Sequence, residues 1–177
     1  INHGLDIASG LHDRLSDVPE FVAAVNKTGV RLLDLRHTDT PIPKATGLKR
    51  EGRRLLTLGT DCAWGKKFTA LATTRDMKVR SIDCTFRATG QTGIMISGEG
   101  YALDTIIGDY IAGAAELLSP ANKRHHWDVI EGQGSILHPS HAGVPLSLLH
   151  GSQPDAYVVC HEPTRQHMLG VTYPIPS

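Results

Sequence analysis

The chain has 177 residues, of which 18 are basic and 18 are acidic, so its formal net charge is zero. This length allows a sizeable core, which must be mainly aliphatic because only 5% of the residues are aromatic. The balanced charge argues against a nucleic-acid partner held by bulk positive charge, and neither a membrane-spanning run nor a signal peptide is visible.

Three scattered cysteines argue against a disulfide scaffold and predict a cytoplasmic protein. The chain begins at Ile1 rather than at a methionine, so we expect it to be a piece of a longer protein. Part of any active site can then lie outside it.

The first 45 residues predict a short helix, a strand and a linker. A polar cap followed by Pro19 predicts the start of the helix, and Gly29 predicts its end. Residues 30–35 predict a strand, and two prolines at 41 and 43 are typical of a linker. We therefore place a domain boundary at residues 44–50.

From residue 46 onward, strand patterns alternate with helix patterns. Asp104 is expected to cap the best helix and Pro120 to stop it. The predicted elements are strands at 53–58, 82–88, 127–130 and 156–159, helices at 66–77 and 104–118, a short apolar piece at 94–96, and a polar loop at 150–155.

This alternation predicts parallel βαβ units, and hence an α/β domain over residues 46–177. The expected fold is a P-loop NTPase-like domain of three layers with a mostly parallel sheet. Ligands of such sheets bind outside the carboxyl ends of the strands. Four polar stretches follow the predicted strands and should meet at that edge: residues 59–66, 89–93, 131–134 and 160–162.

Residues 55–69 have the pattern of a phosphate-binding loop. An apolar strand ends at Gly59, a short polar loop follows, and Gly65 and Lys66 open a helix. Such loops point backbone N–H groups at a phosphate, and the lysine adds a full positive charge.

This loop departs from the Walker consensus in two ways. Five residues rather than four separate the two glycines, and Lys67 replaces the Ser or Thr that binds magnesium, with Thr69 as the nearest hydroxyl. The Asp61 carboxylate would repel a bound triphosphate unless it faces away from it or binds a metal or an amine. Cys62 is expected to be reactive rather than catalytic, with a depressed pKa if exposed. The candidate cofactor-binding residues are Gly59, Thr60, Asp61, Cys62, Gly65, Lys66, Lys67 and Thr69.

Glu131 ends an apolar strand, a place where a carboxylate is rare without a partner. It is a candidate to bind magnesium, orient water or accept a proton, with Gln133 as a weaker neighbour. The donor-rich turn after the second strand is either a plain glycine turn or part of a polar substrate site. Its candidate residues are Arg87, Thr89, Gln91 and Thr92.

The histidines His138, His141 and His150 lack the helical spacing that places two of them on one metal, so we predict no metal site. One of them is a candidate general base; the alternative is that all three are surface or capping residues. Cys160 and His161 are neighbours on a strand and point to opposite faces, which argues against a catalytic pair.

These motifs carry two resemblances. Residues 59–66 with residues 129–134 resemble dethiobiotin synthetase and the amidotransferase-type cobyrinate synthases. A denser set of motifs resembles a bacterial P-loop family of unknown function that includes D-glutamate N-acetyltransferases. That set comprises residues 10–17, 59–66, 87–93, 131–135, 148–156 and 160–163.

The second resemblance implies that residues 1–45 are the end of a nucleotide-fold domain plus a linker. It also implies an N-acetyltransferase that moves acetyl from acetyl-CoA to the amine of a D-amino acid, foremost D-glutamate, with the loop holding CoA phosphates. The first resemblance leaves a ligase or kinase that uses ATP with magnesium as the alternative. We further expect a homo-oligomer with a small-molecule substrate, and neither nucleic acid nor a membrane as partner.

Acetyl transfer needs a base, an oxyanion donor and a clamp for the substrate carboxylates. The candidates are Glu131 or His138 as base, Gln133 or backbone N–H groups as oxyanion donors, and Arg87 or Arg165 as clamps. The resemblance adds Ser152 as a further substrate-binding candidate.

Overall fold

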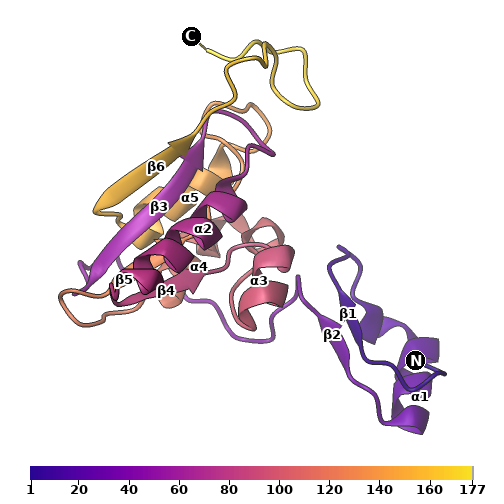
Figure 1. The fold of residues 1–177 in the computed structure, drawn as a ribbon. Coiled ribbons are helices and arrows are strands. Elements are labelled where there is room, and N and C mark those ends of the chain that lie inside the picture. Colours follow the sequence, from indigo (N-terminus) through magenta and orange to yellow (C-terminus); the bar gives the residue numbers. More distant parts are fainter. Residues whose placement is uncertain (177) are drawn as a thin grey trace.

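The computed structural model describes residues 1–176, and its main feature is a four-stranded parallel sheet (Figure 1). The strand order is β4 (Cys84–Arg87), β5 (Trp127–Ile130), β3 (Arg53–Gly59) and β6 (Ala156–Cys160). Every neighbouring pair is parallel. The four predicted strands are therefore confirmed, and β3, which leads into the phosphate-loop sequence, lies between two partners.

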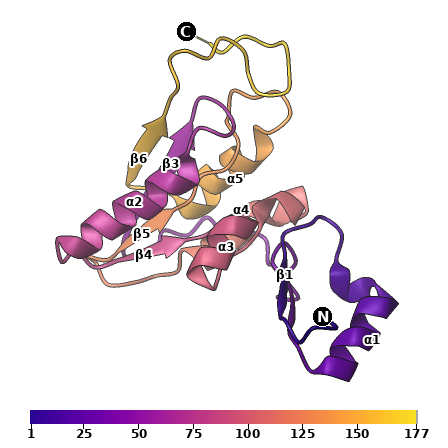
Figure 2. The ribbon, with the colours of Figure 1, turned by 45° about the vertical axis from the view of Figure 1, so that its right-hand side comes forward.

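Helices cover both faces of this sheet (Figure 2). Helix α2 (Lys66–Val79) lies on one face, and α4 (Gly108–Leu118) and α5 (Gly143–Ser152) lie on the other. Because neighbouring residues of a strand point to opposite faces, Val129 packs toward α2 while Ile130 packs toward α4 and α5. The predicted three-layer α/β fold is confirmed.

The first residues form a small βαβ unit (Figure 1). Strands β1 (Ile7–Ser9) and β2 (Leu32–Asp34) pair in parallel, and α1 (Pro19–Thr28) connects them. The helix starts at the predicted proline and ends at Gly29, whose φ of 72° is left-handed. This unit meets the sheet domain through an ion pair between Arg36 and Asp104.

Two predicted elements are wrong in their bounds. The helix expected from Asp104 begins at Gly108, because residues Leu103–Thr105 form a separate 3₁₀ turn and Asp104 binds Arg36 instead of capping. The loop expected at 150–155 is partly helix, since α5 continues to Ser152. Gly151, which suggested a loop, is a packing glycine, because a Cβ there would overlap the Ala112 carbonyl of α4.

The turn expected at 89–93 is also shorter than predicted. Helix α3 (Gln91–Ser97) begins inside it, after Gly90, and includes the apolar piece at 94–96. No helix in the described part of the chain combines the length and the apolar character needed to cross a bilayer.

Arg54 anchors the beginning of β3. Its side chain is fully buried, and its guanidinium donates to five carbonyl oxygens, those of Arg50, Glu51, Gly52, Ser119 and Pro120. These carbonyls belong to the segment before β3 and to the end of α4. One buried cation thus joins both segments to the amino end of the central strand.

We expect the Arg54→Met variant to lower the free energy of unfolding by about 1–3 kcal/mol, because it leaves buried carbonyl groups unsatisfied. The matched control is Arg53→Met. Arg53 is exposed and lies 5.5 Å from the centre of the Trp127 ring, so its loss should cost less than about 1 kcal/mol. Urea unfolding of the full-length protein measures both variants. Equal losses would contradict the anchoring role of Arg54.

Candidate functional site

The loop between β3 and α2 has the geometry of an anion-binding turn. Ala63 and Gly65 both adopt left-handed backbone conformations, with φ of 58° and 79°. A loop in which left-handed residues alternate with other conformations turns successive N–H groups toward one concave side, and this side forms an anion-binding nest. The strand, loop and helix occur at the residues where the sequence predicts them.

The Lys66 side chain folds back along this loop. Its Nζ donates to the Asp61 carbonyl oxygen at 2.8 Å and lies 2.9 Å from the position that a Cβ on Gly59 would occupy. A side chain at residue 59 would therefore push the Lys66 ammonium group out of this position. Lys66 is only 6% exposed, and burial lowers its pKa. No carboxylate of residues 1–176 forms an ion pair with it.

A cavity of about 460 Å³ opens beside the loop at the carboxyl edge of the sheet. Its wall is formed by the phosphate loop, by the segment that follows β5 and by residues at the start of α5 and in the turn before it. The titratable and amide side chains that line it are those of Cys62, Lys66, Lys67, Asp104, Glu131, Gln133 and His141.

Glu131 follows β5 and is held at this cavity by the neighbouring strand exit. Its carboxylate accepts the Thr89 N–H at 3.0 Å, and the Thr89 hydroxyl donates to the Glu131 carbonyl at 2.8 Å. Gln133 donates to the same hydroxyl at 3.0 Å. Glu131 is 3% exposed, and this burial raises its pKa, although the Thr89 N–H opposes part of the shift. Glu131, Gln133 and Thr89 thus form one connected group beside the phosphate loop.

Asp61 turns away from the cavity and toward the C-terminal segment. It is fully buried, and its Oδ2 accepts from Arg165 and from the Leu169 N–H, each at 2.8 Å. Burial raises the pKa of Asp61, but these donors and the Cys62 N–H outweigh it and leave the pKa below the ordinary value. Arg165 also stacks on Trp64, 5.0 Å from the ring centre, so its charge is already engaged within the protein.

Several predicted substrate residues do not reach the cavity. Arg87 donates to Asp128 at 2.7 Å and lines a different hollow. Ser152 is fully buried at the end of α5, where its hydroxyl donates to the Leu148 carbonyl at 2.6 Å. It therefore lies before β6, at the edge opposite the phosphate loop and away from this cavity.

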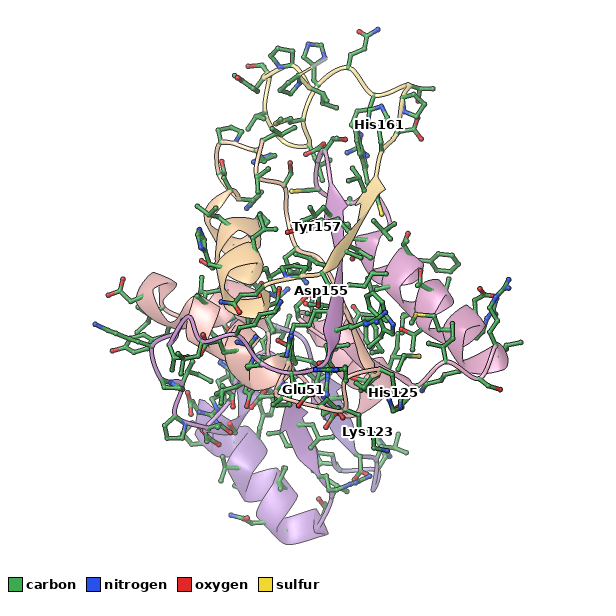
Figure 3. All side chains as sticks on the ribbon, turned by 90° about the vertical axis from the view of Figure 1, so that its left-hand side faces the viewer. Glu51, Lys123, His125, Asp155, Tyr157 and His161 are labelled. Atoms are coloured by element: carbon green, nitrogen blue, oxygen red, sulfur yellow. The ribbon has the colours of Figure 1, made fainter. Side chains whose placement is uncertain are left out.

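The remaining candidates lie around the loop or on α3. Gln91 lies on α3, close to the backbone of Gly10, and Thr92 is exposed on the same helix. The Thr60 hydroxyl is 2.9 Å from Nδ1 of His161. Figure 3 shows His161 beyond the carboxyl end of β6, at the far end of the sheet from Glu51 and His125. The Thr69 hydroxyl accepts the Cys160 thiol at 3.4 Å and does not line the cavity.

His138 is not placed as a general base at the cavity. It is 1% exposed, its Nδ1 accepts the Ser140 N–H at 3.1 Å, and its Nε2 lies 3.0 Å from the Leu169 carbonyl. Both ring nitrogens are therefore engaged, and His141 lines the cavity instead. The low pKa expected for an exposed Cys62 does not apply, because Cys62 is only partly exposed and burial raises its pKa, while Lys66 opposes that shift.

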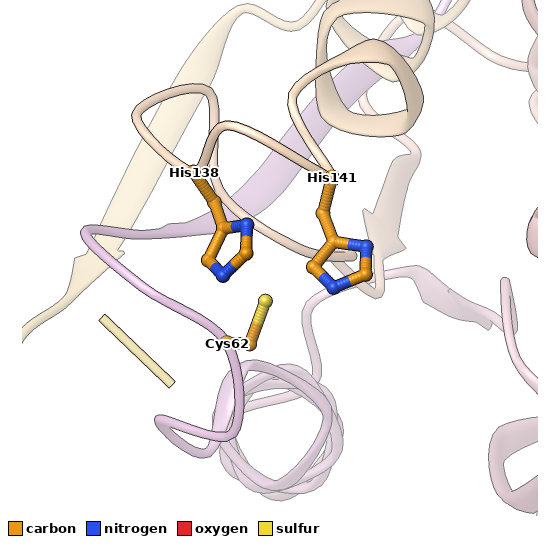
Figure 4. Close-up of side chains that lie close together, drawn as sticks. All are labelled: Cys62, His138 and His141. Atoms are coloured by element: carbon orange, nitrogen blue, oxygen red, sulfur yellow. The ribbon is translucent and has the colours of Figure 1, made fainter. Parts of the chain in front are cut away.

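The structure brings Cys62, His138 and His141 together (Figure 4). The two imidazole rings lie 4.5 Å apart between centres, at the ends of one tight turn. The sequence argument against such a grouping considered helical spacing alone and missed this turn. Trp64 and Asp104 are two further lining residues that we did not select from the sequence, because Trp64 is not a consensus position of the phosphate loop and Asp104 was expected to cap a helix.

Comparisons with known proteins agree with this architecture. A family model described as a P-loop domain of unknown function, DUF1611, matches residues 42–177, and a Rossmann-like DUF1611 model matches residues 1–38. A crystal structure of a DUF1611 family protein from Anabaena variabilis superposes with a TM-score of 0.91 and 36% identity, covering 99% of this chain and 52% of that one.

Two curated relatives carry the name D-glutamate N-acetyltransferase. The protein from a Pseudoalteromonas species is 54% identical over 98% of this chain and 52% of its own length. The protein from Tritonibacter scottomollicae is 52% identical over 100% of this chain and 54% of its own length. The chain thus spans about half the length of the curated relatives it matches.

We expect the Lys66→Met variant to weaken the binding of inorganic pyrophosphate by about tenfold to a hundredfold, the value of one hydrogen bond to a charged group. Without ligand, the variant should be as stable as the wild type or more stable, because a buried cation without an ionic partner is removed. Calorimetric titration and urea unfolding of the full-length protein measure the two effects.

The control for this experiment is Lys78→Met, at the exposed last turn of the same helix. It should leave the affinity for pyrophosphate unchanged. A Lys66→Met variant that loses stability but keeps its affinity would show that Lys66 is structural.

Proposed function

This chain belongs to the DUF1611 family, and we propose that it forms the P-loop part of an N-acetyltransferase that moves acetyl from acetyl-CoA to the amine of D-glutamate. The observation that carries the proposal is the 54% identity over 98% of the chain to a protein named D-glutamate N-acetyltransferase. We propose this activity for the whole protein, because the two curated relatives are about twice as long as this chain.

The phosphate loop suits the phosphates of CoA better than a magnesium-bound triphosphate. Lys66 and Lys67 both line the cavity, and neither forms an ion pair within residues 1–176. The Ser or Thr that holds magnesium in P-loop enzymes is absent, and the Thr69 hydroxyl is occupied by the Cys160 thiol. Backbone N–H groups and two lysines remain, which is the donor set that a pyrophosphate requires.

Glu131 is the group best placed to accept a proton at this cavity. The amine of the acceptor must lose its proton before it attacks the thioester carbonyl, and a base with a raised pKa takes that proton near neutral pH. The attack gives a tetrahedral oxyanion, which collapses to the amide and expels the CoA thiolate. N–H groups of the loop and the Gln133 amide are the donors available to that oxyanion.

The direct test uses the full-length protein with acetyl-CoA and measures free CoA with a thiol reagent. The proposal expects thiol release with D-glutamate and far less with L-glutamate or without an amino acid. No release with any D-amino acid would overturn it. ADP formation from ATP that depends on magnesium would support the ligase or kinase alternative instead.

We expect the Glu131→Gln variant to lower kcat by about a hundredfold or more, because general-base catalysis contributes about that much. In the wild type, kcat/KM should fall on acidification, when Glu131 becomes protonated. Burial raises the pKa of Glu131, so this fall should occur at a higher pH than the ordinary glutamate value of 4.5. Steady-state kinetics across pH measure both effects.

The matched control is Glu51→Gln, an exposed carboxylate at the opposite edge of the sheet (Figure 3). It should leave kcat and the pH profile unchanged. If Glu131→Gln kept the wild-type kcat and the same acid limb, Glu131 would not be the base.

A further inference from the structure

Cys62, His138 and His141 form a cluster that the proposed acetyl transfer does not use. One ligand atom of each residue, a thiol sulfur and two ring nitrogens, lies within 4.8 Å of the other two (Figure 4). Figure 4 shows the Cys62 side chain pointing from the phosphate loop toward the two rings, which come from a different loop. The cluster therefore joins two segments that are far apart in the sequence.

Two backbone features hold the cluster in place. Residues 135–142 form a tight turn, in which the His141 N–H and the Ala142 N–H both donate to the His138 carbonyl. On the other side, the backbone of Leu169 contacts both loops: its N–H donates to Asp61, next to Cys62, and its carbonyl oxygen lies 3.0 Å from Nε2 of His138. Hydrogen bonds thus hold the His138 ring directly, and they hold the backbone on which Cys62 and His141 stand.

The hydrogen bonds of His138 also fix its tautomer. A carbonyl can only accept, so Nε2 carries the proton and donates it to Leu169. A backbone N–H can only donate, so Nδ1 presents its lone pair to Ser140. A metal bound to His138 would replace one of these two hydrogen bonds, the one from Ser140 at Nδ1 or the one to Leu169 at Nε2. The ring nitrogen that does not bind the metal would keep its backbone partner, which is the outer-shell contact typical of a metal ligand.

The distances are compatible with coordination after small movements. Three atoms no more than 4.8 Å apart all lie within about 2.8 Å of a common point, whereas Zn–S and Zn–N bonds are about 2.3 Å and about 2.0 Å long. Each side chain therefore needs to move by less than about 1 Å. A thiolate with two imidazoles is a donor set that suits zinc and similar divalent transition metals rather than magnesium or calcium.

We propose that Cys62, His138 and His141 form a binding site for a divalent transition metal of the zinc class. Cys62 and His141 line the cavity, while His138 is buried behind them. Three protein ligands leave one coordination position of a tetrahedral metal open, as in catalytic rather than structural zinc sites. Because Cys62 and His141 line the same cavity as Lys66 and Glu131, water or an oxygen of a bound substrate can reach the metal from that cavity.

The test uses Co²⁺ added to metal-free full-length protein, because Co²⁺ replaces zinc and is coloured. We expect about one Co²⁺ per chain, with the visible bands of a tetrahedral site and a thiolate-to-cobalt charge-transfer band. Cys62→Ser should abolish the charge-transfer band. His141→Ala should weaken binding at least about tenfold, and since His141 is exposed, this variant should keep its fold.

The matched controls are Cys84→Ser, a thiol on β4, and His150→Ala, an exposed histidine at the end of α5. Both should keep the wild-type spectrum and affinity. No tetrahedral Co²⁺ spectrum in the wild type, or the same spectrum and affinity in Cys62→Ser and His141→Ala, would overturn the proposal. These readouts do not depend on acetyl transfer, so this site and the proposed function can fail separately.

Discussion

The ammonium group of Lys66 lies inside the protein, 2.8 Å from a neutral carbonyl oxygen and away from any carboxylate partner among the described residues. Burying a cation in this way is costly unless an anion joins it. Much of the surrounding geometry serves this placement. Gly59 leaves room for the lysine, and Gly132 lets the exit of β5 approach so closely that a Cβ would overlap the Thr57 carbonyl. The fold therefore maintains a positive site whose energetic balance depends on a bound anion.

The one acidic residue of the loop does not cancel this positive site, because the C-terminal segment neutralises it. Arg165 and the Leu169 N–H hold the Asp61 carboxylate on the side away from the cavity. Two acidic residues line the cavity: Asp104, which pairs with Arg36, and Glu131, whose burial favours its neutral form. The same pocket thus combines an anion cradle with a carboxyl group ready to exchange a proton, which is the combination that acyl transfer from a phosphate-bearing donor needs.

The strand and loop pattern of the sheet domain was predictable because aliphatic runs, a Gly-Lys pair and parallel alternation are local signals. Glu131 was predictable for the same reason, as a carboxylate at the end of an apolar strand. Gly93 and Gly151 contributed to the wrong prediction of a turn at 89–93 and a loop at 150–155. Both lie inside helices, where the missing side chain allows close contact with the Glu131 carboxylate and with α4, respectively. The position of the Arg87 side chain depends on Asp128, a partner distant in sequence that no local pattern reveals. Ser152 differs, because its hydroxyl bonds to Leu148 four residues earlier, and its place before the last strand already predicts the amino edge of the sheet.

The C-terminal segment links the two parts of the site. A single residue, Leu169, donates its N–H to the carboxylate beside Cys62 and accepts from the ring of His138 at its carbonyl oxygen. Since Asp61 and Cys62 are neighbours, the residue that helps to hold the Asp61 carboxylate away from the cavity also connects the backbone beside the thiol to the His138 ring. A shift of this segment would therefore disturb the phosphate cradle and the Cys62–His138–His141 cluster together. The two sites share one structural support, although they bind by different chemistry.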